Sequence, residues 1–85
     1  MKLHYLKLQE KYWNDVMSGM KGFELRKNDR DFKVGDLIIF VEADTQPKEH
    51  VIQSKPFVIT YVLKNVPEFG LNEEYAILSI ERVQS

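Results

Sequence analysis

A cluster of three charged residues is the part of this sequence best suited to chemistry. Lys21, Glu24 and Arg26 fall within a six-residue stretch that follows Gly19. If residues 22–27 form a strand, side chains alternate between its two faces, so Glu24 and Arg26 share one face, about 7 Å apart along the backbone. The apolar residues beside them take the other face. The spacing therefore predicts a site in which an ammonium, a carboxylate and a guanidinium act together.

Two kinds of chemistry are open to this cluster. In a binding module, Arg26 presents a planar fork to a phosphate or a guanine-like edge, Lys21 adds a point charge, and Glu24 orients both or accepts from an exocyclic amine. In a hydrolase, Lys21 and Glu24 form an acid–base pair if burial moves their pKa values toward neutrality. Because the cluster holds no serine, threonine or cysteine, a water activated by Glu24 would be the nucleophile. The remaining alternative is a structural ion pair between Glu24 and Arg26, worth about 0–1 kcal/mol at an exposed site.

Other residues are candidates for ligand binding around the cluster. Lys27 and Arg30 carry positive charge into the polar run after the predicted strand. Tyr61 or Tyr75 could stack a base, as aromatic side chains commonly do with unpaired nucleotides. His4 is interpreted first as a hydrogen-bonded structural histidine, and it remains a candidate because its strand could border the cleft.

Length and composition predict one small domain, residues 1–85, with a core just large enough to fold unaided. The 85 residues include no cysteine, which leaves neither a disulfide nor a thiolate metal site. His4 and His50 lie 46 positions apart without acids at ligand-like spacing, so neither a metal nor a cofactor is expected. No apolar run reaches about 18 residues and no signal pattern is visible, so we expect a cytoplasmic protein without a membrane partner.

The charge distribution favours a small ligand over a nucleic-acid duplex. The formal net charge of −1 argues against a bulk polyelectrolyte binder. Residues 21–33, however, hold five basic and three acidic side chains, a net charge of +2, so the remainder carries −3. A local basic patch on an acidic body suits an anionic, nucleotide-like ligand. The alternative is a solvated loop of mixed charge.

One helix and five main strands are expected to position the cluster. The helix is predicted over residues 10–18, and Gly19 is expected to end it in the left-handed conformation. Its apolar residues recur with helical period and are interpreted as core: Tyr12, Trp13, Val16, Met17 and Met20. Strands are predicted at residues 3–8, 22–27, 37–41, 56–63 and 75–83. Residues 42–55 and 64–72 are predicted to be connections, the first with a short strand near residues 50–53.

Two of the strands carry more specific expectations. The continuous apolar run at residues 37–41 predicts a strand covered on both faces. In the strand at 56–63, Phe57, Ile59, Tyr61 and Leu63 are expected on one face. Together the elements predict an α+β fold, a curled and nearly closed β-barrel of about five to six strands with one main helix packed across it.

The charged cluster also resembles a family signature. The run Gly19-Met20-Lys21-Gly22-Phe23-Glu24-Leu25-Arg26 resembles the G-x-K-x-x-E-x-R motif of the ASCH domain, and it stands at the usual place, after a first strand and helix. The phrases HYLKL, FELRKNDRDFKVGD, ITYVL and YAILSI resemble a subfamily of small stand-alone bacterial and phage ASCH proteins. The likeness covers about residues 3–82.

The resemblance implies a PUA-like barrel that binds RNA or a nucleotide in a cleft lined by Lys21, Glu24 and Arg26. It also leaves an enzyme open, because one small relative is an amidohydrolase of acetylated cytidine and another has been described as a ribonuclease. The amidohydrolase uses a threonine nucleophile, and here its position holds Glu24, with Thr60 a stand-in by residue type only. The expectation is thus an RNA-, nucleotide- or nucleoside-binding ASCH domain. The alternative is a small amidohydrolase or ribonuclease with Lys21 and Glu24 catalytic. The oligomeric state is left open.

Overall fold

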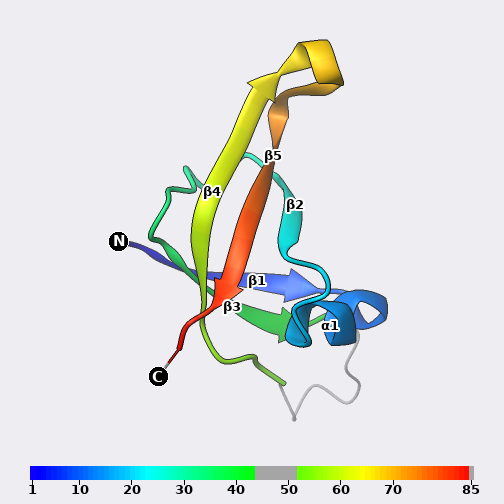
Figure 1. Cartoon of the computed structure of the whole chain (residues 1–85), viewed down its shortest axis with the longest axis vertical. Helices are drawn as coiled ribbons and strands as arrows, with labels where there is room; N and C mark the ends of the chain where they lie inside the picture. Colours follow the sequence, from blue (N-terminus) through cyan, green and yellow to red (C-terminus); the bar gives the residue numbers. More distant parts are fainter. Residues whose placement is uncertain (44–51, 85) are drawn as a thin grey trace.

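Five strands form one sheet that curls into a half-barrel beside a single α-helix in the computed structural model, which describes residues 1–43 and 52–84 (Figure 1). The elements in chain order are β1 (Leu3–Leu8), α1 (Glu10–Met17), β2 (Phe23–Lys27), β3 (Leu37–Glu42), β4 (Phe57–Val66), the 3-10 turn η1 (Pro67–Phe69) and β5 (Leu71–Arg82). The strand order is β1-β3-β4-β5-β2, with β1 and β3 parallel and the other neighbours antiparallel. The predicted α+β curled sheet with one main helix is confirmed.

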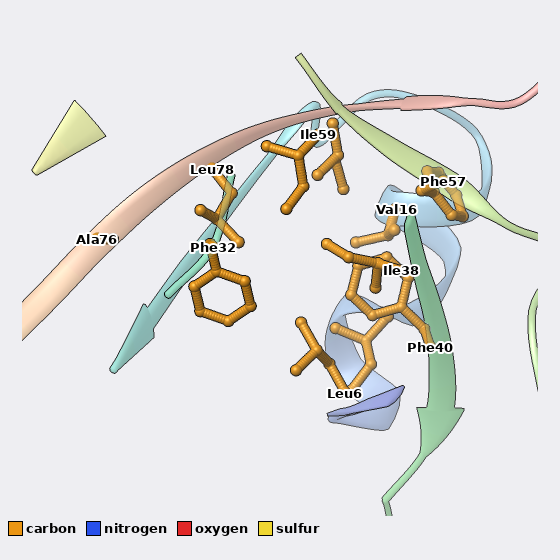
Figure 2. Packing of buried hydrophobic residues seen from close by; sticks show 11 residues of the cluster. Leu6, Val16, Phe32, Ile38, Phe40, Phe57, Ile59, Ala76 and Leu78 are labelled. Atoms are coloured by element: carbon orange, nitrogen blue, oxygen red, sulfur yellow. The ribbon is translucent and has the colours of Figure 1, made fainter. Parts of the chain in front are cut away.

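The core fills the inside of the curl. Among the described residues, the buried hydrophobic side chains come from α1, the loop before β3 and every strand except β2: Leu6, Leu8, Val16, Phe32, Ile38, Phe40, Phe57, Ile59, Ala76, Leu78 and Ile80. Figure 2 shows Val16 of α1 beside Phe57 and Phe40, with Leu6 reaching in from β1. The rings of Phe40 and Phe57 meet edge to face at 5.3 Å, a favourable arrangement for aromatic pairs.

β1 and α1 agree with their sequence patterns, with one correction. Alternate residues of β1 are buried, as a strand with one face on the core requires. Val16 is fully buried, and Gly19 has a φ of +82°, which confirms the predicted helix end. The apolar stripe is wrong at its two ends, because Tyr12 is 39% exposed and Met20 is 84% exposed. Met20 lies beyond the turn at Gly19, so it has left the helical face.

β3 and β4 differ from the prediction in which faces they bury. Only alternate residues of β3 are fully buried, so the strand predicted to be covered on both faces is half exposed on one of them. In β4 a register shift between Ile59 and Tyr61 inserts an extra residue. A bulge of this kind reverses the faces of the residues beyond it, so Tyr61 and Leu63 are exposed instead of sharing the face of Ile59.

The predicted connection at residues 64–72 is present but shorter than expected. β4 continues to Val66 and β5 begins at Leu71, so the two strands form one long hairpin closed by η1 (Figure 1). Gly70 supplies the positive φ of 85° with which the reversal ends, and Asn65, at a register shift within β4, has a φ of 56°. The polar and turn-forming residues that suggested a loop therefore belong to an exposed two-stranded ribbon.

The predicted connection at residues 42–55 is described only at its ends. β3 extends one residue further than expected, to Glu42, and Gln53 forms an isolated antiparallel bridge with Val41. The expected short strand near residues 50–53 lies outside the described residues apart from this bridge. Within the described ranges no helix is long and apolar enough to cross a membrane.

Candidate functional site

Glu24 joins Lys21 and Arg26 into one cluster. One carboxylate oxygen, Oε1, accepts a hydrogen bond from Lys21 Nζ at 2.7 Å, and the other, Oε2, accepts one from Arg26 Nε at 2.8 Å. Glu24 is only 4% exposed, while the side chains of Lys21 and Arg26 are 18% and 22% exposed. The three charges that the sequence brings together by spacing thus meet in space, with the carboxylate innermost.

The local backbone explains why Lys21 reaches Glu24. The turn at Gly19 brings the chain back against α1, where the Lys21 N–H donates to the carbonyl of Asp15 at 2.9 Å. From that point Lys21 Nζ also donates to the carbonyl of Phe23 at 2.9 Å. The ammonium is therefore held at the start of β2 by a carbonyl and a carboxylate together.

β2 places its charged face inward and its apolar face outward. Glu24 is buried, whereas Phe23 and Leu25 are 49% and 56% exposed. Such an inversion is informative, because an ordinary surface strand does the reverse. Burial of a charge requires partners, and both partners of Glu24 are cations from its own neighbourhood.

Two arginines donate hydrogen bonds to β1 across the open side of the half-barrel: Arg26, on β2, and Arg30, in the loop after β2. The carbonyls of Lys2 and Leu8 accept hydrogen bonds from Leu37 and Ala43, on the side of β1 that faces β3. Carbonyls at alternate positions point to the opposite edge. There Lys7 accepts from Arg26 Nη2 and Tyr5 accepts from Arg30 Nη1. Two guanidinium groups therefore take the place of strand pairing along this seam.

A groove of about 630 Å³ lies where β1, α1 and β2 meet. Its lining combines basic, aromatic and aliphatic side chains: Lys7, Leu8, Gln9, Lys11, Tyr12, Lys21, Phe23, Glu24, Leu25 and Arg26. Lys21 Nζ lies 5.3 Å from the centre of the Tyr12 ring and 4.7 Å from that of Phe23. Four basic side chains against one carboxylate give the groove a net charge of +3.

The sequence predicts only three of the ten lining residues to be in the site: Lys21, Glu24 and Arg26. It places Tyr12 in the core and gives Lys7, Lys11 and Phe23 no role in the site. The available signal was the short step from β1 into α1, since β1 ends at Leu8 and α1 begins at Glu10. That step brings both Lys7, near the end of β1, and Lys11, near the start of α1, into the groove lining.

The remaining predicted site residues are dispersed. Arg30 lies at the seam, and Lys27 is exposed at the end of β2, paired with Tyr75 of β5. Tyr61 is 60% exposed on β4, and it does not line the groove. His4 is 6% exposed and also lies away from the groove lining.

His4 belongs to a second polar cluster, centred on Asp36. His4 Nε2 lies 2.9 Å from Asp36 Oδ2, which also accepts from the Lys33 N–H, while Asp36 Oδ1 accepts from the Lys2 N–H. Phe32 covers the imidazole, with 4.8 Å between ring centres. Burial alone raises the pKa of Asp36. The hydrogen bond from His4, those from the backbone of Lys2 and Lys33, and the charge of His4 outweigh it and lower that pKa to about 2.

Neither cluster has the composition of a metal centre. In residues 1–43 and 52–84, no three histidine, cysteine or acidic side chains gather closely enough to hold a metal ion. The groove lining offers one carboxylate, and that carboxylate already accepts from two cations.

Comparison with known proteins identifies a family and a phage relative. A family model described as "Domain of unknown function (DUF3850)" matches residues 3–80. A curated phage relative, the "Uncharacterized 12.9 kDa protein in GpA 3'region" of Escherichia phage P2, is 44% identical over 41 residues, which are 48% of this chain. The match covers 38% of that relative's length. The matching family is not named as an ASCH domain, so the ASCH resemblance remains an interpretation of the sequence.

Proposed function

The chain belongs to the DUF3850 family, and from the geometry of its groove we propose that it binds a nucleotide or a single-stranded stretch of RNA there. The observation that carries this proposal is the convergence of Lys21, Glu24 and Arg26 on one groove with aromatic walls. A net charge of +3 in the groove of a chain with a formal net charge of −1 favours an anionic ligand.

Lys21 and Arg26 retain donors for a phosphate. Lys21 Nζ has three protons, and two are directed at Phe23 and Glu24. Arg26 uses Nε and Nη2, while its Nη1 has no partner within the described part of the chain. Glu24 sets the direction of both cations, so in this proposal it is a positioning residue and does not read the ligand itself.

Tyr12 and Phe23 are the proposed stacking surface for a base. Both residues line the groove and are 39% and 49% exposed, so a ligand in the groove can reach their rings. Stacking on an aromatic ring is worth about 1–3 kcal/mol per base and tolerates any base. The groove thus offers cations for a phosphate and aromatic rings for a base, which suits a nucleotide better than an inorganic anion.

The ASCH resemblance agrees with this proposal. Its signature residues Lys21, Glu24 and Arg26 are those that meet in the groove, and the resemblance implies binding of RNA or nucleotides in a cleft beside the helix. We therefore include membership of the ASCH group, with its PUA-like barrel, in the proposed identity of the domain.

Hydrolysis of a modified nucleoside or RNA is the second candidate, and one distance favours it. Lys21 Nζ and Glu24 Oε1 are 2.7 Å apart, within reach for proton transfer. Against it, each oxygen of Glu24 already accepts from a cation, so activating a water requires one of these pairs to open. Among the described residues that line the groove there is also no serine, threonine or cysteine.

A titration with nucleotides tests the proposal. Adenosine, cytidine, guanosine and uridine monophosphates and short single-stranded RNA are added while amide chemical shifts are followed. We expect binding at millimolar affinity or better, and about tenfold weakening in Lys21→Met, since a hydrogen bond to a charged group is worth about 1.5–3 kcal/mol. Asp31→Asn, which alters an exposed carboxylate outside the groove lining, is the control.

A parallel turnover screen with acylated nucleosides and RNA separates the two candidates. Binding without turnover supports a binding module, whereas turnover that Lys21→Met and Glu24→Gln both abolish supports the hydrolase. If neither variant differs from the wild type in either assay, the groove is not a functional site.

A further inference from the structure

The hairpin formed by β4, η1 and β5 projects beyond the rest of the sheet. β2 pairs with β5 only as far as Tyr75, and beyond that pair Asn28 donates from its N–H to the carbonyl of Glu74 and from its side-chain amide to the carbonyl of Glu73. Residues 64–74 therefore form a two-stranded arm, and none of them belongs to the buried core. Figure 1 shows this arm at one end of the molecule, with β1, β3 and α1 toward the other.

The tip of the arm presents an aromatic ring to solvent. Phe69 is 86% exposed, so its ring is available for contact with another molecule. The tip is nevertheless well defined. Gly70 adopts a φ of 85° and donates to the carbonyl of Pro67 at 2.9 Å, and Val66 pairs with Leu71 beneath the turn. A preorganised aromatic tip loses little entropy when it docks.

The charge of the arm indicates what it does not bind. Residues 64–74 carry one lysine and three glutamates, a net charge of −2. Phosphates would be repelled by Glu68, Glu73 and Glu74, so a nucleic acid or an anionic membrane is a poor partner. The complementary surface has to be basic at its rim and apolar inside.

The groove of the same chain has that chemistry. It combines a net charge of +3 with the rings of Tyr12 and Phe23 and the side chains of Leu8 and Leu25, and its volume of about 630 Å³ is ample for one phenylalanine side chain. The arm lies away from its own groove, because the groove is lined by β1 and α1, which Figure 1 shows toward the other end of the 42 Å axis of the molecule.

We propose that the arm, residues 64–74, docks through Phe69 and Glu68 into the Lys- and Arg-lined groove of a second copy of this chain. Two copies that exchange arms about a twofold axis would form a closed pair with both grooves covered. The contact at each tip is small, so we expect weak association, with a Kd of order 10–1,000 µM. The docked arm and a groove ligand would exclude each other, although the arm proposal holds whether or not the groove binds nucleotides.

Sedimentation velocity at low ionic strength, from about 10 µM to about 1 mM protein, tests this inference, because contacts between charged surfaces are strongest there. We expect the weight-average mass of the wild type to rise toward that of a dimer, and Phe69→Ser to stay monomeric. Phe69 contacts little of its own chain, so this variant should fold normally. Glu68→Lys or Lys11→Glu alone should weaken association at least tenfold, and the double variant should recover part of it.

A spin label identifies where the arm docks. Because the chain has no cysteine, Asn72→Cys gives a single labelling position on the arm that leaves Phe69 and Glu68 in place. Mixed with an unlabelled, ¹⁵N-enriched copy, it should broaden the amides of Lys21 and Phe23. A wild type that remains monomeric throughout, equal association of Phe69→Ser, or broadening away from the groove would each overturn the proposal. Phe69→Ser should bind nucleotides normally, because Phe69 is outside the groove lining of its own chain. Loss of self-association and loss of nucleotide binding can therefore be told apart.

Discussion

Two carboxylates are buried to nearly the same extent in this molecule, and they are surrounded differently. Asp36 is 3% exposed and Glu24 is 4% exposed. Asp36 accepts from one imidazole and two backbone N–H groups, and Phe32 closes the space beside it. Within residues 1–43 and 52–84, Glu24 accepts from the side chains of Lys21 and Arg26 alone, and a groove lies beside it.

The contrast between these carboxylates shows that burial and pairing do not by themselves mark a functional one. Backbone donors cannot leave Asp36 without unfolding the turn after Lys33 and the start of β1, so its partners are fixed. The partners of Glu24 are long side chains that can turn toward a ligand in the groove. A buried charge with movable partners at a cavity is the stronger candidate for a site, and one with backbone partners is the stronger candidate for stability.

The largest expected effect separates the two residues by stability. Asp36→Ala leaves His4 and two N–H groups buried without their acceptor, and we expect the free energy of unfolding to fall by about 3–5 kcal/mol. That is a large part of the stability of a domain of 85 residues. Urea denaturation measures it, with Asp31→Asn, an exposed carboxylate, as the control. A loss below about 1 kcal/mol would mean that the Asp36 cluster does not hold the fold.

The pH dependence of stability sharpens the same contrast. The pKa of Asp36 is lowered from 3.8 to about 2 in the folded chain, so the folded state prefers the ionised form. Its contribution is present above pH 4 and is lost as the pH falls from about 4 to about 2. The shift corresponds to roughly 2 kcal/mol. Chemical denaturation across this range should show a steeper acid-induced decrease in the wild type than in Asp36→Asn, and equal slopes would contradict the assignment.

The sequence predicts the cluster around Glu24, whereas the cluster around Asp36 depends on pairing between distant segments. The twofold period of a strand predicted that Glu24 and Arg26 share a face, and Gly19 predicted where the helix ends. The pairing of His4 with Asp36 spans 32 positions and exists because β1 lies parallel to β3, which places His4 opposite Ile38. No local pattern encodes that register.

Other errors have local physical causes. The extra residue in β4 between Ile59 and Tyr61 turned Tyr61 away from the inner face, and bulges leave no periodic signal in a strand of apolar and aromatic residues. The arm was predicted to be a loop because Pro67 and Gly70 are turn formers, yet here they close one hairpin instead of separating two shorter strands.

The smallest expected stability effect belongs to Glu24, and it completes the comparison. Glu24→Gln keeps the shape of the side chain but removes its charge. We expect a loss of roughly 1–2 kcal/mol, near the low end for a hydrogen bond to a charged group, because Lys21 and Arg26 are each about one-fifth exposed and can turn to water. Urea denaturation measures this loss. Nucleotide titration of the same variant should show a loss of binding free energy that is much larger than the loss of unfolding free energy. A variant that loses as much stability as Asp36→Ala but binds normally would assign Glu24 to the fold and leave the groove without its organising residue.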